Sequence, residues 1–260
     1  MLNLQALFVE RIMAAVSIEH KRELKRARHT PEQRHAELVA RLLAGEQLGT
    51  AELGYDLDGW HLGVIATGIG AREALSAMAR SADRQLLSVS HREETVSAWL
   101  GGKRRIEVGD LGVVVPAEQG ADLALAIGEP GRGLQGWRLT HRQAQAARLV
   151  ALHRPRRLTR YAEEMLLAAA LRDETLANSL QEIFLAPLRS QRDGGASSLQ
   201  TLREYLSSGC NASAAGSELG VNRHTVESRL NTAQQHLGRE LDTCLVELEV
   251  ALRLEELQRE

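Results

Sequence analysis

The chain has 260 residues, of which 43% are hydrophobic and 25% are charged, and its formal net charge is −2. These values are typical of a soluble globular protein with room for two ordinary domains. The small net charge argues against a broad polycationic surface. Aromatic residues make up only 3% of the chain, so Leu, Ala, Val and Ile must build most of the core.

The cysteine content and the apolar runs exclude further classes of protein. Cys210 and Cys244 are too few and too far apart for a disulfide framework or a metal site, which indicates a reducing compartment. The longest uninterrupted apolar run, residues 165–171, is too short to span a bilayer. Glu10 and Arg11 interrupt the N-terminal apolar stretch, so it does not qualify as a signal peptide. We therefore expect a cytoplasmic protein without a membrane partner.

The first 45 residues are predicted to form two helices. The first covers residues 2–29 and has an apolar stripe made of Leu4, Phe8, Ile12 and Val16. Pro31 opens the second, over residues 32–44, and Gly45 ends it. A leading amphipathic helix either pairs with a second copy of the chain or packs on the next domain, and both alternatives remain open.

The hydrophobic period changes after residue 58 and then alternates between that of strands and that of helices. The pattern predicts strands over 61–67, 85–91, 111–115, 122–127 and 157–161, and helices over 71–82, 92–100 and 137–153. Such alternation is typical of an α/β sandwich with helices on a sheet. Residues 163–188 are predicted to be helical, and residues 192–197 to form a linker before a further helix over 199–207. The predicted fold class is α+β, a mixed α/β sandwich followed by an all-α domain.

A helix-turn-helix pattern follows in residues 210–230. Ser213 can cap a short first helix, Gly220 can close it, and Asn222 can cap a second helix. Two short capped helices around a glycine turn can present the second helix to a groove.

The second helix of this pattern has two distinct faces. Its apolar stripe consists of Val226, Leu230, Ala233 and Leu237, which should point into the domain. The opposite face carries His224, Ser228, Asn231 and Gln235, with Thr225 and Thr232 to one side. These short polar side chains can reach base edges. Arg223 and Arg229 flank the apolar stripe, where a guanidinium group meets phosphate more naturally than a base.

Two observations argue against reading this pattern as DNA binding from its local sequence alone. Similar helix pairs occur in bundles that contact no nucleic acid. In addition, six arginines face ten acidic residues from Ser197 to the end of the chain, so that segment has a net charge of −4. A single copy would release few counterions, so DNA affinity should be modest unless two copies bind together.

Residues 131–136 match G-x-G-x-x-G between a predicted strand and a predicted helix, as in a dinucleotide-binding fold. The context differs, because Arg156 and Arg157 stand where an acidic residue should hold the ribose. We expect this stretch to be a flexible connection. The nine histidines include no H-E-x-x-H motif and no cluster at metal spacing, so we expect no metal site, no cofactor and no catalytic residue.

Six runs of the C-terminal part share one further pattern. They are residues 202–206, 210–213, 219–226, 228–230, 237–242 and 251–254. Together they resemble the PucR/CdaR-like family of bacterial transcriptional regulators. In that family this segment is a DNA-binding helix-turn-helix that ends the chain.

The middle of the chain resembles the family's degenerate relative of the diguanylate cyclase fold. Residues 106–116 stand where a cyclase has its G-G-D-E-F hairpin, but Val108 replaces the first glycine, Leu111 the glutamate and Gly112 the aromatic residue. Without that glutamate the site lacks a metal ligand, so the resemblance implies no cyclase activity. The resemblance covers roughly residues 34–260, and the opening helix looks like the exit helix of an upstream sensor domain.

The resemblance divides the chain into four segments. Residues 1–45 hold the N-terminal helices, a dimerisation or sensor-exit segment. A degenerate GGDEF-like α/β domain covers residues 46–175, a helical linker covers 176–198, and a helix-turn-helix DNA-binding domain covers 199–260.

The predicted function is that of a DNA-binding transcriptional regulator, not an enzyme, which acts as a dimer or higher oligomer. Its predicted partners are double-stranded DNA, a further copy of the chain and an unidentified small-molecule effector. The residues predicted to bind DNA are Ser213, Asn222, Arg223, His224, Thr225, Ser228 and Arg229. The alternative is a nucleotide-sensing or nucleotide-handling enzyme that uses the α/β domain.

Overall fold

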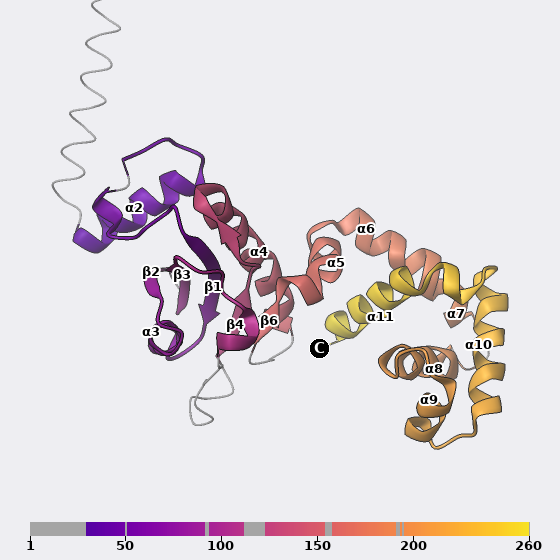
Figure 1. Ribbon diagram of the computed structural model, residues 1–260. Coiled ribbons are helices and arrows are strands. Elements are labelled where there is room, and N and C mark those ends of the chain that lie inside the picture. Colours follow the sequence, from indigo (N-terminus) through magenta and orange to yellow (C-terminus); the bar gives the residue numbers. More distant parts are fainter. Residues whose placement is uncertain are drawn as a thin grey trace, which may run out of the picture.

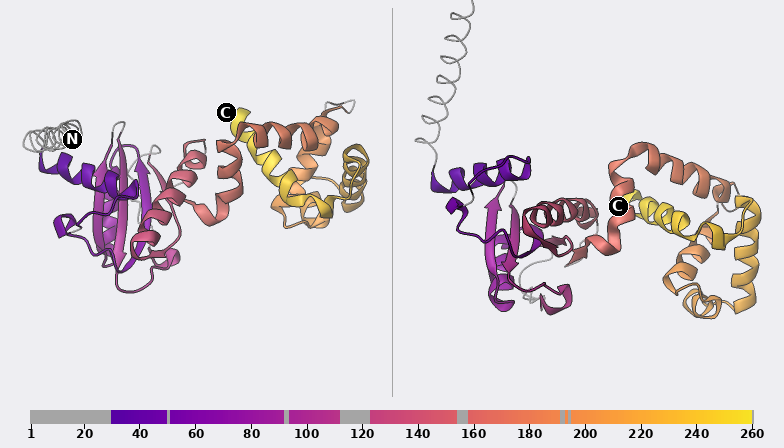
Figure 2. Two further views of the ribbon diagram at one scale, coloured as in Figure 1. Left: turned by 90° about the horizontal axis from the view of Figure 1, so that it is seen from above. Right: turned by 45° about the horizontal axis from the view of Figure 1, so that its top comes forward.

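The computed structural model describes residues 30–49, 51–91, 94–111, 123–153, 158–190, 193 and 195–259. These residues form a sheet lobe (residues 31–160) and a helical lobe (residues 161–259), which lie side by side along an elongated molecule (Figure 1; Figure 2). The predicted fold class, a mixed α/β layer followed by an all-α part, is confirmed. The helix predicted over residues 2–29 lies outside the described residues, as does most of the strand predicted over 111–115.

The described part of the sheet lobe contains three α-helices and two 3-10 turns among its strands. In chain order its elements are α2 (Pro31–Leu43), a 3-10 turn (Ala51–Leu53), β1 (Trp60–Thr67), α3 (Ala71–Ser81), β2 (Gln85–Ser90), β3 (Thr95–Gly102), a 3-10 turn (Val108–Leu111), β4 (Ala124–Ile127), β5 (Gly131–Arg132), α4 (Gly133–His153) and β6 (Thr159–Arg160). The strand order is β2–β3–β1–β4–β6, and β5 pairs with one end of β1. All pairs are antiparallel except β4 with β6.

The prediction of a helix over residues 92–100 is wrong. Thr95–Gly102 forms β3, which pairs with β1 on one side and with β2 on the other. Every residue from Thr95 to Gly101 is buried, because helices cover both faces of the sheet. A strand that is buried on both faces lacks the polar alternation by which strands are recognised in a sequence. The 3-10 turn over Val108–Leu111 also takes up the first residue of the strand predicted over 111–115.

The two faces of the sheet are covered by different helices. On one face, α3 packs on Leu62 and Val64 of β1 and on Ala98 of β3. On the other, α4 and α2 enclose Trp99 of β3, whose ring stacks on Trp137 of α4 at 4.5 Å between centroids. Figure 1 shows α3 and α4 on opposite sides of the strands. The sheet is therefore the middle layer of a three-layer lobe.

Helix α4 lies unusually close to the sheet because glycines remove side chains from the contact. The amide of Gly63 in β1 donates to Thr140 Oγ1 at 2.7 Å, and a Cβ on Gly63 would lie 2.8 Å from the amide nitrogen of His141. Likewise, a Cβ on Gly131 would lie 2.6 Å from the Cα of Gly136. The stretch expected to be a flexible connection is thus strand β5 and the first turn of α4, so that expectation is corrected.

The helical lobe begins directly after β6. Its elements are α5 (Tyr161–Arg172), α6 (Glu174–Leu180), a π-helical turn (Gln181–Leu185), α7 (Ala186–Arg189), α8 (Ala196–Ser207), α9 (Ala212–Leu219), α10 (Arg223–Leu237), a 3-10 turn (Leu241–Thr243) and α11 (Leu245–Arg259). The helix predicted over 163–188 is interrupted at Asp173, whose extended backbone ends α5 and whose carboxylate accepts from the amide of Leu176. Within the described ranges, no helix has the length and apolar character needed to cross a membrane.

His141 of α4 is buried where this helix packs on β3. His141 is 4% exposed, its ring lies 4.7 Å from that of Trp99, and its Nδ1 has no hydrogen-bond partner among the described residues. Burial, together with the neighbouring His91, lowers the pKa of His141 to about 4. The folded protein therefore holds this ring in its neutral form.

Acid should destabilise the fold through His141. Because folding lowers its pKa from 6.5 to about 4, its contribution is fully present above the unfolded pKa and is lost as the pH falls between these values. Over that range the wild type should lose about 3 kcal/mol more unfolding free energy than a His141→Gln variant. Urea titrations across the range would measure the difference, and parallel curves for the two proteins would contradict the assignment.

Candidate nucleic-acid interface

The predicted helix-turn-helix forms from α9 and α10, which pack on α8. Gly220 and Gly238 close the two helices with left-handed backbone at φ 66° each. Gly216 allows close packing at the turn, because a Cβ there would lie 2.8 Å from the carbonyl oxygen of Val221. Gly220 therefore closes the first helix as predicted.

The caps agree with the sequence at one helix and differ at the other. Asn222 caps α10, since its Oδ1 accepts from the amide of Thr225 at 2.8 Å, as predicted. The cap of α9 is Asn211 and not Ser213, because Asn211 Oδ1 accepts from the amides of Ser213 and Ala214. Ser213 instead lies exposed in the first turn of α9. Asn211 takes the cap position because it has the extended backbone that a cap requires.

The apolar stripe of α10 points inwards as predicted. Its members Val226, Leu230, Ala233 and Leu237 are all buried. They join one core with Leu202 of α8 and Ala215 of α9. Burial of this stripe fixes the rotation of α10 about its axis, and hence which residues face outwards.

The polar face of α10 is exposed. Its line of outward residues consists of His224, Ser228, Asn231 and Gln235. Thr225 is half-buried, and its hydroxyl donates to Asn222 Oδ1 at 3.0 Å, so it supports the cap. Short polar groups on one exposed helix face can read base edges in a major groove.

The two arginines predicted to bind phosphate lie on opposite edges of this face. Arg223 is 64% exposed in its side chain and donates from Nε to Glu227 at 2.7 Å. Arg229 is half-buried and donates from Nη1 to Thr201 Oγ1 of α8 at 3.3 Å. Arg229 is therefore tied to the supporting helix, while Arg223 extends from the surface.

Glu227 is a residue of this face that the sequence reasoning missed. Its carboxylate contacts Arg223 and lies 3.3 Å from Nδ1 of His224, which is 93% exposed. The hydrogen bond from Arg223 is the main cause that lowers the pKa of Glu227. The sequence itself indicates this ion pair, because Arg223 and Glu227 are four residues apart in a predicted helix and such residues are neighbours on a helix surface.

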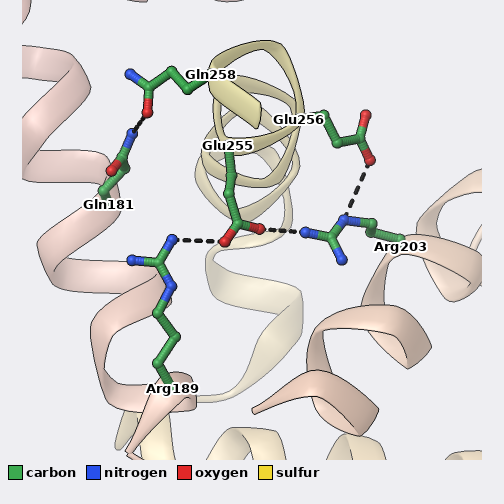
Figure 3. Close-up of polar contacts among 6 residues, drawn as sticks. All are labelled: Gln181, Arg189, Arg203, Glu255, Glu256 and Gln258. Carbon is green, nitrogen blue, oxygen red and sulfur yellow. Dashed lines mark hydrogen bonds and ion pairs between the residues drawn. The ribbon is translucent and has the colours of Figure 1, made fainter. Parts of the chain in front are cut away.

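A buried carboxylate holds α8, and with it the helix-turn-helix, against its neighbours. Glu255 of α11 has a side chain that is 5% exposed and lies between Arg189 of α7, at 2.6 Å, and Arg203 of α8 (Figure 3). Arg203 also pairs with Glu256 at 3.2 Å. Figure 3 shows a further contact in which Gln181 donates to Gln258 at 2.6 Å. The two contacts of Glu255 join α7, α8 and α11 at one point.

A second buried ion pair joins the first and the last helix of the helical lobe. Arg253 of α11 donates to Glu164 of α5, whose side chain is 6% exposed. Helix α5 packs on α4 of the sheet lobe. The last helix of the chain is therefore anchored to the helix that follows the sheet.

The sheet lobe offers no comparable chemical site within its described residues. Val108 and Leu111, which stand in place of the cyclase glycine and glutamate, are buried in the core beside α3. Gly131 and Gly136 serve helix packing, as shown above. No group of three His, Cys, Asp or Glu residues that could hold a metal ion occurs in the described ranges.

Comparison with known proteins agrees with both parts of this architecture. The GGDEF-like domain family matches residues 46–150, and the PucR C-terminal helix-turn-helix domain family matches residues 198–254. The two segments cover more than half of the chain. The chain belongs to the PucR-like transcriptional regulators.

Other comparisons add little to this assignment. The crystal structure of the regulator of polyketide synthase expression from Bifidobacterium adolescentis shares 18% sequence identity, over 89% of this chain and 96% of that one, with a TM-score of 0.43. A likeness at that TM-score supports no inference. No curated protein matches the chain.

In this PucR-like chain, the buried ion pairs reach beyond the matched helix-turn-helix segment. Arg203 and Arg253 lie inside residues 198–254, whereas their partners Glu255 and Glu164 lie outside. Arg189 also lies outside. The helix-turn-helix unit is thus fixed by residues of the preceding helices and of the end of α11.

Removal of the Glu255 charge should destabilise the helical lobe. Glu255→Gln leaves two guanidinium groups without a buried counter-charge and should cost about 2–3 kcal/mol of unfolding free energy. This cost lies below the usual loss for a fully buried pair, because Arg189 and Arg203 stay partly hydrated. Glu256→Gln is the matched control, since Glu256 is 37% exposed and should cost less than about 1 kcal/mol. Urea unfolding would compare them, and equal costs would contradict the role given to Glu255.

Proposed function

We propose that this PucR-like regulator binds double-stranded DNA as a dimer or higher oligomer, with α10 in the major groove. The observation that carries the proposal is the division of α10. An apolar stripe is buried on α8 and α9, and a line of exposed polar side chains faces outwards from a capped N-terminus. This is the arrangement by which a recognition helix presents base-reading groups while its partner helices support it.

Each predicted residue has a role consistent with its position. His224, Thr225 and Ser228 read base edges from the first turns of α10. Arg223 and Arg229 bind phosphates on either side of the groove. Ser213 and Asn222 stand at the N-terminal ends of the two helices, where amide groups and the helix dipole favour phosphate.

The charge of the helical lobe supports pairing of two copies. The segment from Ser197 to the end of the chain has a net charge of −4, so one copy gains little from counterion release. Two copies on adjacent half-sites double the number of phosphate contacts. We assign the sheet lobe a role in this assembly or in relaying the signal of an unidentified small-molecule effector, in a cytoplasmic protein that is not an enzyme.

The alternative, a nucleotide-handling enzyme, has less support. Gly131 and Gly136 of the G-x-G-x-x-G stretch pack against each other, and the cyclase-hairpin positions Val108 and Leu111 lie in the core. Calorimetry with guanine nucleotides and Mg²⁺ distinguishes the two functions. Tight binding or turnover would favour the enzyme.

Loss of both arginines should weaken DNA binding without loss of the fold. An Arg223→Ala, Arg229→Ala protein should bind the DNA upstream of its own gene at least about tenfold more weakly, and the slope of log affinity against log salt should fall by about two per copy. Fluorescence anisotropy across a salt series would measure both. The control replaces Arg132 and Arg172, two exposed arginines outside the helix-turn-helix, with alanine. Unchanged affinity in a folded double variant would overturn the site.

A further inference from the structure

Glu227 lies among the groups proposed to contact DNA, yet it carries the wrong charge for a phosphate contact. It follows His224 by three residues and Arg223 by four on α10, and its carboxylate touches both side chains. Its own side chain is 38% exposed at the edge of the outward face. Because the hydrogen bond from Arg223 lowers its pKa, the group is ionised at neutral pH.

A carboxylate in this place should be unfavourable against most DNA. The phosphates repel it from both sides of the groove. Among base edges, guanine N7 and O6 and thymine O4 are acceptors and would also repel it. Cytosine presents the N4 amino group as a donor in the major groove, and a Glu or Asp side chain can accept from it. Adenine also has a donor, N6, but its acceptor N7 lies beside it, so cytosine alone offers a matched partner without an acceptor on the same base.

We propose that Glu227 is a specificity-determining residue that selects a cytosine in each half-site by accepting a hydrogen bond from its N4 amino group. The inference rests on the DNA-binding function proposed above. The contact with Arg223 supports it, because a carboxylate that binds Arg223 through Nε leaves the two Nη groups to donate to phosphate. Glu227 thus holds the Arg223 side chain toward phosphate while its own carboxylate accepts from the base.

A purely structural role for Glu227 predicts a different outcome. An exposed pair four residues apart on a helix contributes little to folding, and an acid near a helix N-terminus favours the helix dipole. If that were its whole role, replacing Glu227 would leave the preferred DNA sequence unchanged. Base preference at a single position is therefore the measurement that separates the two roles.

The test is selection from a library of duplexes with a randomised core, using the full chain and its Glu227→Gln and Glu227→Ala variants. The wild type should select a motif with cytosine at one position of each half-site, preferred about tenfold over the other bases. In Glu227→Gln that position should change to adenine, because a glutamine amide pairs with adenine N6 and N7. In Glu227→Ala the cytosine position of the motif should lose its base preference, while all other positions keep theirs. The affinity of this variant for non-specific duplex should rise.

A matched control and the contrary outcomes keep the proposal falsifiable. Glu247→Gln removes the same charge from an exposed residue of α11 and should leave the motif unchanged. Circular dichroism checks that each variant is folded. A wild-type motif retained by both Glu227 variants, or a uniform loss of preference at every position, would overturn the base contact. If the wild type itself selects no motif, the proposed DNA-binding function fails, and the assignment of Glu227 fails with it.

Discussion

The helical lobe depends on one carboxylate that is almost withdrawn from water. Desolvation of a charge costs several kcal/mol, and only a well-placed counter-charge offsets that cost. Glu255 meets this condition with Arg189 on one side and Arg203 on the other. The arrangement tolerates little displacement, since movement of either arginine would remove one of the two counter-charges of a buried carboxylate. Helix α8 is thereby fixed between α7 and α11. Because α10 packs on α8 through its apolar stripe, the direction of the recognition helix follows from this contact.

The recognition surface that results is polar and not strongly cationic. Of the two arginines at its edges, Arg229 is partly engaged with Thr201, and Arg223 is engaged with Glu227. Several acidic groups of the lobe are used inside it, as with Glu255 and Glu164, so they do not all face the DNA. Even so, the surface lacks the density of positive charge that supports tight binding by a single module. The pairing of copies proposed above would supply the phosphate contacts that a single surface lacks.

Interactions within a few residues could be predicted from the sequence, and those between distant segments could not. The cap at Asn222, the turn at Gly220 and the buried stripe of α10 depend on spacings of three and four residues. In contrast, Arg203 and Arg189 lie 52 and 66 residues before Glu255, and no periodicity links them. The sequence predicts a helix where β3 lies, because burial on both faces removes the alternation of a strand. Ser213 was mistaken for a cap because Asn211 satisfies the same rule two residues earlier.

The base contact proposed for Glu227 would have opposite effects on affinity and on specificity. An acidic group at the edge of a recognition face lowers affinity for every sequence through phosphate repulsion, and recovers part of the loss only where a base offers a donor. The ratio of specific to non-specific binding then rises although the absolute affinity falls. For a regulator that must find few sites among many, this ratio matters more than the dissociation constant. In the proposed function, pairing of copies that carry few cations already restricts non-specific binding. The base contact proposed for Glu227 would extend the same restriction to individual base pairs.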